Sequence, residues 1–302
     1  MITVKFVGGV IPKSTKEIWG GSKATFNSMI KSFENDKEIN FIYKTRSDFK
    51  SVKECYNFLK DGDISHVDDT GIISTLFLNE YPAPDVIGPI VRSPIKNYKN
   101  WQCNYEKDWF YKAKIIRLNY SEERKNHELV NLIRHGVDTD FLKLSTKKKK
   151  YILWAGMIQR YAKNYELMEE IMKITKLPEG YEFKIMNKYN VEDYWKTLDE
   201  TAILINTSRY ESFCCALFEA RAKGVATIQQ LLLNGVGVHK YAPIQVEYEA
   251  EAYKDKILEL LKDEKYKKVG EECREYCVKN ASLKIMCDDM TKIYKEIFKN
   301  KK

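Results

Sequence analysis

The sequence carries the same alternation of short apolar runs and helical patterns on both sides of a lysine run at residues 147–150. Before that run, the β-branched stretches 2–9 and 39–45 flank a segment with helical apolar spacing at residues 22–33. After it, the alternation restarts with the apolar run 150–158. Strands that alternate with helices favour parallel sheets with right-handed crossovers, and the restart favours two sheets rather than one. The predicted fold class is therefore α/β, with two Rossmann-like domains.

The length of the chain agrees with this division. A chain of 302 residues with 44% hydrophobic content can bury a large core and lies near the size at which one domain gives way to two. We place the first domain at residues 1–145 and the second at 146–302. The closing helix, predicted over residues 283–299, is expected to pack back on the first domain.

Charge and cysteine content limit the class of binding partner and the cellular compartment to be expected. The net charge of +8 suits a phosphate-bearing partner, although a solvated lysine-rich surface explains it equally well. Seven scattered cysteines do not form a disulfide framework, which indicates a reducing, cytoplasmic location. Cys273 and Cys277 lack the partners of a zinc site and suit packing on a helix face. No stretch is apolar enough to cross a membrane, which leaves only peripheral membrane contact open.

The residues that suggest chemistry lie where a strand over residues 200–208 gives way to a helix from about Cys214. Ligands of open parallel sheets bind at such junctions, and the first N–H groups of the helix favour an anion such as phosphate. Glu211 lies in the turn and Glu219 more than one helical turn further on. Their carboxylates could accept hydrogen bonds from hydroxyl groups on either side of the phosphate.

This pair of glutamates resembles the sugar-donor signature of the retaining glycosyltransferases of the GT-B class, the large family that includes bacterial mannosyltransferases and sucrose synthases. The resemblance implies that Glu211 contacts the transferred sugar and that Glu219 contacts the ribose of the nucleotide. Residues 136–140, Gly-Val-Asp-Thr-Asp, resemble the stretch that closes the first domain in this family. Lys163 matches a lysine that holds the donor diphosphate, and residues 288–298 resemble the closing helix.

Two features depart from the family pattern. The usual Gly-Phe-Gly after the first glutamate is replaced by Ser212-Phe213-Cys214, which changes the sugar pocket because only glycine permits the closest backbone approach. The family arginine that accompanies the lysine is replaced by Met157, whose thioether cannot supply a guanidinium fork. Arg160 or Arg209 could take its place.

The resemblance therefore implies a retaining hexosyltransferase that moves a sugar from a UDP- or GDP-linked donor to an acceptor hydroxyl, without a metal or any other cofactor. The acceptor is a glycan, a lipid or a protein, and a modified DNA base is an alternative. A rival, prompted by Met157, is a protein that binds nucleotide sugars without catalysis, and an epimerase of the same fold is a third option. The predicted catalytic residues are Lys163, Arg160 and Glu211; the predicted donor-binding residues are Gly20, Gly21, Glu211, Ser212, Phe213, Cys214 and Glu219.

Two residues of the predicted strand over residues 64–69 are expected on the acceptor side. His66 and Asp68 follow the pattern of polar groups at a carboxyl strand end. A lone histidine in such a place is also a common packing residue, and both interpretations of His66 stay open at this stage.

Overall fold

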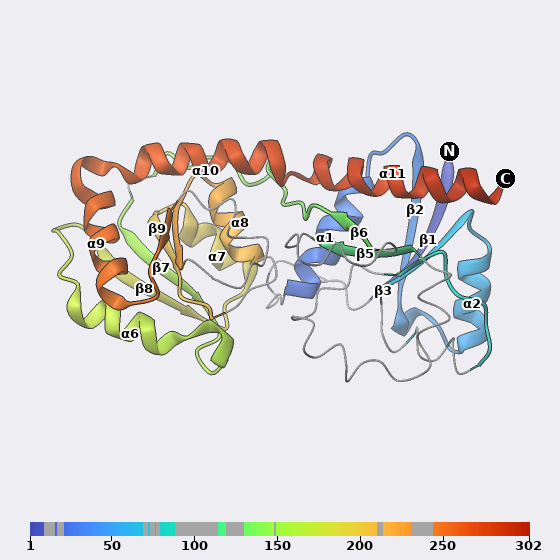
Figure 1. Ribbon diagram of the computed structural model, residues 1–302, viewed down its shortest axis with the longest axis horizontal. Helices are drawn as coiled ribbons and strands as arrows, with labels where there is room; N and C mark the ends of the chain where they lie inside the picture. The colour runs from blue at the N-terminus through green and yellow to red at the C-terminus, as the bar shows by residue number, and fades with distance from the viewer. Residues whose placement is uncertain are drawn as a thin grey trace. The chain divides into compact units, whose positions relative to one another are not determined.

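The structure of the protein is a computed structural model. It describes residues 1–8, 16, 21–68, 72, 76, 79–87, 114–118, 130–147, 149–209, 214–230 and 244–302. These residues divide into two compact units: the first contains the described residues of 1–12, 20–136 and 283–302, and the second those of 13–19 and 137–282. Each unit is built around its own parallel sheet, as the restart of the sequence pattern predicts (Figure 1).

The sheet of the first unit has the strand order β2-β1-β3-β4-β5-β6, and every described pairing in it is parallel. Its strands are β1 (Ile2–Gly8), β2 (Ile39–Thr45), β3 (Ile64–Asp68), β4 (Val86–Ile87), β5 (Lys114–Leu118) and β6 (Val130–Ile133). In the register of β1, Gly8 lies opposite both Thr45 and Asp68, so the carboxyl ends of these three strands lie at one edge of the sheet.

Alternating side chains of these strands build a core on each face of the first sheet. Val4 and Phe6 belong to a cluster with residues of α1 (Gly21–Phe33) and α11 (Leu283–Lys301). Val7 belongs to a separate cluster with residues of α2 (Val52–Lys60). The C-terminal helix α11 is therefore part of the first unit, although the chain reaches it only after the whole second unit (Figure 1).

The sheet of the second unit has the order β11-β10-β9-β7-β8 and is also parallel throughout. Its strands are β7 (Tyr151–Gly156), β8 (Glu182–Asn187), β9 (Thr201–Asn206), β10 (Ala226–Gln230) and β11 (Ile244–Val246). Its helices are α6 (Tyr165–Ile174), α7 (Val191–Leu198), α8 (Cys215–Ala222), α9 (Ala250–Leu261) and α10 (Tyr266–Asn280). Helices pack on both faces, which explains why the central strands read as continuous apolar runs.

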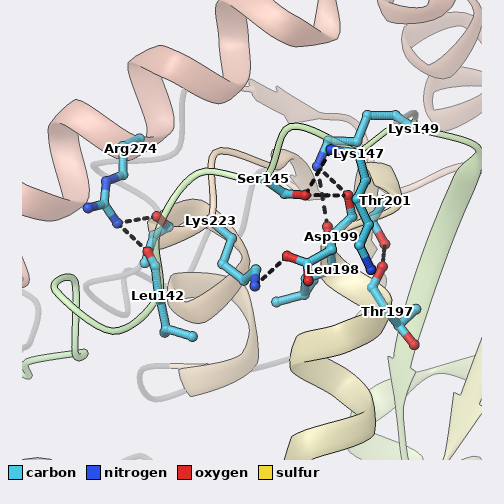
Figure 2. Close-up of polar contacts among 11 residues, drawn as sticks. Leu142, Ser145, Lys147, Lys149, Thr197, Leu198, Asp199, Thr201, Lys223 and Arg274 are labelled. Atoms are coloured by element: carbon cyan, nitrogen blue, oxygen red, sulfur yellow. Dashed lines mark hydrogen bonds and ion pairs between the residues drawn. The ribbon is translucent and has the colours of Figure 1, made fainter.

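The lysine run that separates the two sequence patterns has a structural role in the second unit. Lys149 Nζ donates to the carbonyl of Asp199 at 2.9 Å, at the C-terminal end of α7 (Figure 2). Burial lowers the pKa of Lys149 from 10.5 to about 8. Lys223 Nζ contacts the Asp199 carboxylate at 2.5 Å, and Arg274 donates to the carbonyls of Leu142 and Ala222 (Figure 2). Lys149 and Arg274 thus lie at helix and loop carbonyls, where positive charge is favourable, and Lys223 makes an ion pair with Asp199.

Candidate functional site

The carboxyl edge of the second sheet gathers polar residues from segments that are far apart in the sequence. The registers of the sheet place the ends of β7, β9, β10 and β11 at this edge. In open parallel sheets, ligands bind beyond the carboxyl ends of the strands, so this edge is the expected position of a ligand site.

After β7 the chain makes a 3-10 turn over Tyr161–Lys163 before α6 begins. Lys163, expected at the start of a helix, is the last residue of this turn, and its N–H donates to the Arg160 carbonyl at 2.8 Å. Asn164 follows in the left-handed conformation with φ of 46° and leads into α6. Met157 and Arg160 are exposed, and Arg160 is the residue before the turn.

A short segment after β9 ties this turn to the sheet. The Thr207 hydroxyl accepts a hydrogen bond from Trp154 Nε1 at 2.9 Å and donates to the Lys163 carbonyl at 2.9 Å. Both Thr207 and Trp154 are almost fully buried. The backbone position of Lys163 is therefore fixed by a hydroxyl that is itself held by the core of the sheet.

Arg209, from the same segment, lies against the turn. Its Nη2 donates to Asn164 Oδ1 at 2.6 Å, and its backbone N–H donates to the Ala162 carbonyl at 2.8 Å. The guanidinium carbon lies 4.4 Å from the ring centroid of Tyr161, a cation–π contact. Arg209 Nε is buried and has no hydrogen-bond partner among the described residues. Glu166 is 4.0 Å away and largely exposed, so it offers only a weak ion pair.

The remaining strands add polar groups to the same network. Tyr248, which follows β11, makes a hydrogen bond with the Asn164 side chain, and its hydroxyl lies 3.4 Å from the Thr207 carbonyl. Gln230, the last residue of β10, is buried and donates to the carbonyl of Ser208. Four strands thus contribute to one network beside the turn that carries Lys163.

The second helix at this edge is α8, which begins at Cys215. Cys214 precedes it with φ of 56° and makes no side-chain capping hydrogen bond to the helix. A left-handed conformation suits glycine, which is the residue that the resembling family has at this position. Cys214 Sγ lies 3.8 Å from Asn206 Nδ2 at the end of β9. Glu211, Ser212 and Phe213, three predicted site residues, lie outside the described residues.

Glu219, the second glutamate of the pair, is buried on α8. Loss of hydration raises the pKa of its carboxyl group from 4.5 to about 8, and the neighbouring Trp195 indole N–H acts in the opposite direction. At neutral pH the group is therefore mostly protonated in the absence of a ligand. It can both donate and accept a hydrogen bond in this state.

The two residues assigned to the acceptor side lie in the first unit. His66 is fully buried in β3, and its Nδ1 lies 2.7 Å from the Tyr294 hydroxyl of α11. This environment fits the packing interpretation of His66. Asp68 is the last residue of β3 and is partly buried. Gly21 begins α1, and Gly20 lies outside the described residues.

The described part of the chain contains no group of three or more histidine, cysteine or acidic side chains placed to hold a metal ion. Among the same residues, no helix combines the length and the apolar character that a membrane span requires.

Several residues of this site were not singled out from the sequence, among them Tyr161, Asn164, Thr207 and Tyr248. An asparagine directly before an amphipathic helix is a usable signal, since asparagine tolerates the left-handed conformation seen at Asn164. Thr207 and Tyr248 carry no such signal, because their contacts join strands that are distant in the sequence.

Comparisons with known proteins agree with this architecture. No protein-family model matches the chain, and no curated protein matches its sequence. Among solved structures, it is similar to sucrose-phosphate synthase from Thermosynechococcus elongatus, with a TM-score of 0.70 and 13% identity over 99% of this chain and 100% of that one. HepE from Anabaena, in complex with UDP, gives a TM-score of 0.71 at 9% identity over 98% and 100% of the two chains.

A third similar structure is an alpha-glucosyltransferase in complex with UDP and a 13-mer DNA, with a TM-score of 0.66 and 10% identity over 97% and 99% of the two chains. At these identities the likeness establishes the fold. The chain has the GT-B fold class of these glycosyltransferases, which confirms the predicted fold class.

Proposed function

We propose that the protein is a glycosyltransferase that moves a sugar from a nucleoside diphosphate sugar to an acceptor hydroxyl with retention of configuration. The observation that carries the proposal is the arrangement of Lys163, Asn164 and Arg209 at the carboxyl edge of the second sheet. Lys163 lies two residues before α6, and Arg209, from the end of another strand, donates to Asn164 at the N-terminus of that helix. The fold is shared with glycosyltransferases.

In this proposal the cationic groups hold the diphosphate. Lys163 and Arg209 supply positive charge. The first N–H groups of α8, which the Cys214 side chain does not cap, supply hydrogen bonds. Arg209 takes the role of the family arginine that Met157 replaces, since its side chain is ordered by Asn164 while Arg160 is exposed. Glu211 would contact the transferred sugar, and Glu219 the ribose.

The chemical step breaks the bond between the anomeric carbon and the oxygen of the terminal phosphate. The acceptor oxygen bonds to the same face of that carbon, and its proton passes to the departing phosphate oxygen. Negative charge grows on the diphosphate during this step, so preorganised cations and N–H groups lower the barrier. Lys163 and Arg209 supply this charge in the proposal, which requires no metal ion.

The nucleotide is UDP or GDP, and UDP sugars are the first to test. HepE and the alpha-glucosyltransferase have both been crystallised with UDP, and HepE also with UDP-glucose. The acceptor is a hydroxyl of a glycan, a lipid or a protein; the DNA in the alpha-glucosyltransferase complex keeps a modified base as an alternative.

A thermal-shift screen of UDP and GDP sugars, followed by an assay of nucleoside diphosphate release, tests the function. A ligand at about 100 times its Kd adds about 2.7 kcal/mol of stability, so binding is readily detected. Lys163→Ala should lower the release rate about 10²–10³-fold. Lys173→Ala, an exposed lysine on α6, is the matched control and should keep the wild-type rate.

Two outcomes would contradict the proposal. Stabilisation by a nucleotide sugar without any release of nucleoside diphosphate, across a panel of acceptors, would favour the non-catalytic binding protein. A wild-type rate of nucleoside diphosphate release in Lys163→Ala would show that the proposed site takes no part in the reaction.

A further inference from the structure

Helix α8, whose N-terminus belongs to the proposed diphosphate site, carries a buried cation that the proposed reaction does not use. Arg221 lies in the last turn of α8, and its side chain is fully buried. The helix packs against β10 and α10, so the guanidinium group lies inside the second unit. An arginine is rarely buried to this degree unless an acidic group pairs with it.

The groups that hold the guanidinium are neutral. Arg221 Nε donates to Thr227 Oγ1 at 3.0 Å, and Nη2 lies 3.4 Å from Gln229 Oε1. The guanidinium carbon lies 5.0 Å from the ring centroid of Phe218. Nη1 is buried and has no hydrogen-bond partner among the described residues. These contacts fix the position of the group, but none of them brings a negative charge to it.

No carboxylate in the described part of the chain pairs with Arg221. The titratable groups that act on its charge are the thiols of Cys273, Cys277 and Cys214 and the phenol of Tyr276. Burial raises the pKa of Cys273, and it raises the pKa of Cys277 to about 12, so both thiols are neutral at pH 7. A guanidinium keeps its proton in proteins even where burial lowers its pKa.

Glu219, two residues earlier on α8, does not neutralise Arg221 either. Burial raises the pKa of its carboxyl group to about 8, so this group is mostly protonated at pH 7, and its hydrogen-bond partner is Trp195 of α7. The described residues of the second unit therefore enclose one positive charge without a negative charge beside it. Such an uncompensated charge destabilises the folded state, because its lost hydration is not replaced.

The position of Arg221 relates this charge to the proposed diphosphate site. Side chains on a helix lean toward its N-terminus, which for α8 lies at the carboxyl edge of the sheet. Gln229, which lies beside the guanidinium, is the last residue but one of β10, so the group lies near the carboxyl end of that strand. Cys214, directly before α8, is within electrostatic reach of Arg221. The buried charge therefore lies close to the edge where the diphosphate is proposed to bind.

We propose that Arg221 is the buried counter-charge of the donor diphosphate and attracts it through the protein interior without touching it. This inference rests on the proposed function, since it takes the diphosphate to lie at the N-terminus of α8. Buried charges are screened much less than exposed ones, so the attraction extends beyond contact distance. The bound diphosphate supplies the negative charge that no described residue brings to Arg221.

Removal of the charge should change stability and binding in opposite directions. Arg221→Met keeps a long, unbranched side chain and should raise the urea midpoint of the ligand-free protein, because an unpaired buried charge is gone. The Kd for UDP or GDP, whichever the wild type binds more tightly, should rise about 10-fold. One attraction across about 10 Å, at an effective dielectric constant of about 20, changes an affinity by about that factor. Urea unfolding and calorimetric titration measure the two effects.

Two variants serve as matched controls. Lys268→Met removes the same charge from an exposed position on α10, where water and salt screen it, and should bind the nucleoside diphosphate as the wild type does. Thr227→Val keeps the charge of Arg221 but removes the acceptor of its Nε group. It should lower the urea midpoint, since a buried donor is left unpaired, and should change the Kd little.

Arg221→Met that binds the nucleoside diphosphate as tightly as the wild type would overturn the inference. So would a loss of stability together with affinity in Arg221→Met, because it would assign to Arg221 only the packing of α8. Lys163→Ala separates these outcomes from a failure of the proposed function. If Lys163→Ala weakens nucleotide binding and Arg221→Met does not, only the role of Arg221 fails. If neither UDP nor GDP binds to the wild type, the proposed donor site fails, and the role of Arg221 fails with it.

Discussion

Arg209 Nη2 donates a hydrogen bond to Asn164 Oδ1 at 2.6 Å and so joins two segments that are 45 residues apart in the sequence. The asparagine sits in a left-handed conformation at the start of α6, and the arginine packs over the ring of Tyr161. This contact holds a guanidinium group beside the turn that carries Lys163. Its position is set before any ligand arrives, which is the requirement for electrostatic stabilisation of a developing anion.

The first prediction concerns which arginine, Arg209 or Arg160, supplies the positive charge that the resembling family takes from an arginine at the position of Met157. Arg209→Gln should lower kcat/KM with a nucleoside diphosphate sugar about 10²–10³-fold, because one preorganised cation is lost. Arg209→Lys should recover only part of that loss, since an ammonium group cannot reproduce a planar guanidinium fork. Arg160→Gln, at an exposed position three residues before Lys163, should change kcat/KM little.

Steady-state kinetics of the three variants decide between the two arginines, with unfolding midpoints to confirm that each variant is folded. A large loss in Arg160→Gln with near-normal rates in Arg209→Gln would assign the role to Arg160. Small and equal losses of kcat/KM in Arg160→Gln and Arg209→Gln would mean that neither arginine is required. The proposed diphosphate site would then consist of Lys163 and the N–H groups of α8 alone.

The second prediction concerns pH and Glu219. Burial raises the pKa of its carboxyl group from 4.5 to about 8, so between these values the folded state binds a proton that the unfolded state has lost. Retention of this proton stabilises the folded state fully below about pH 4.5, and this stabilisation is lost as the pH rises toward 8. Glu219→Gln keeps a neutral hydrogen-bonding group and removes the titration. The difference in unfolding free energy between variant and wild type should therefore grow in favour of the variant from pH 5 to 8, by on the order of 4 kcal/mol.

Urea unfolding of the ligand-free protein at several pH values measures this difference. Glu271→Gln removes an exposed carboxylate from α10 and is the control; its pH dependence should follow the wild type. A constant offset between Glu219→Gln and the wild type across the range would show that Glu219 does not titrate there.

Strands with continuous apolar runs were predictable from the sequence, whereas β10 and β11 were not expected. The strand β10 ends in Gln229 and Gln230, and both side chains are buried. Gln229 accepts from Arg221 Nη2 at 3.4 Å, and Arg221 is itself fully buried, with Nε donating to Thr227 at 3.0 Å. Sequence patterns predict that glutamine and arginine lie at the surface. A strand whose buried side chains include glutamines, paired with a buried arginine of a helix, is therefore not recognised from such patterns.

The residues of the candidate site likewise fall into those that could be predicted from the sequence and those that could not. Lys163, Cys214 and Glu219 were identified because the linear sequence around them resembles motifs of a glycosyltransferase family. Asn164 and Thr207 act through contacts across the strand ends, and their contribution depends on the order of the strands in the sheet. No linear pattern contains that order.

The last prediction concerns Thr207, whose hydroxyl connects the buried indole of Trp154 to the Lys163 carbonyl. Thr207→Val keeps the shape of the side chain but leaves the Trp154 N–H and the Lys163 carbonyl without this partner. An unsatisfied buried polar group costs about 1–3 kcal/mol, so the unfolding free energy should fall by about that amount. Nucleotide-sugar affinity should fall as well, because the turn that positions Lys163 loses its tie to the sheet.

Thr175→Val is the matched control for this change. The Thr175 hydroxyl is also buried, and it has no hydrogen-bond partner among the residues that the structure describes. Its replacement by a methyl group removes an unsatisfied polar atom and should be neutral or stabilising. Chemical denaturation of both variants, with titration of a UDP sugar, compares the two hydroxyls directly. Equal effects of the two substitutions would mean that the hydrogen bonds of Thr207 neither stabilise the second unit nor hold the Lys163 turn in place.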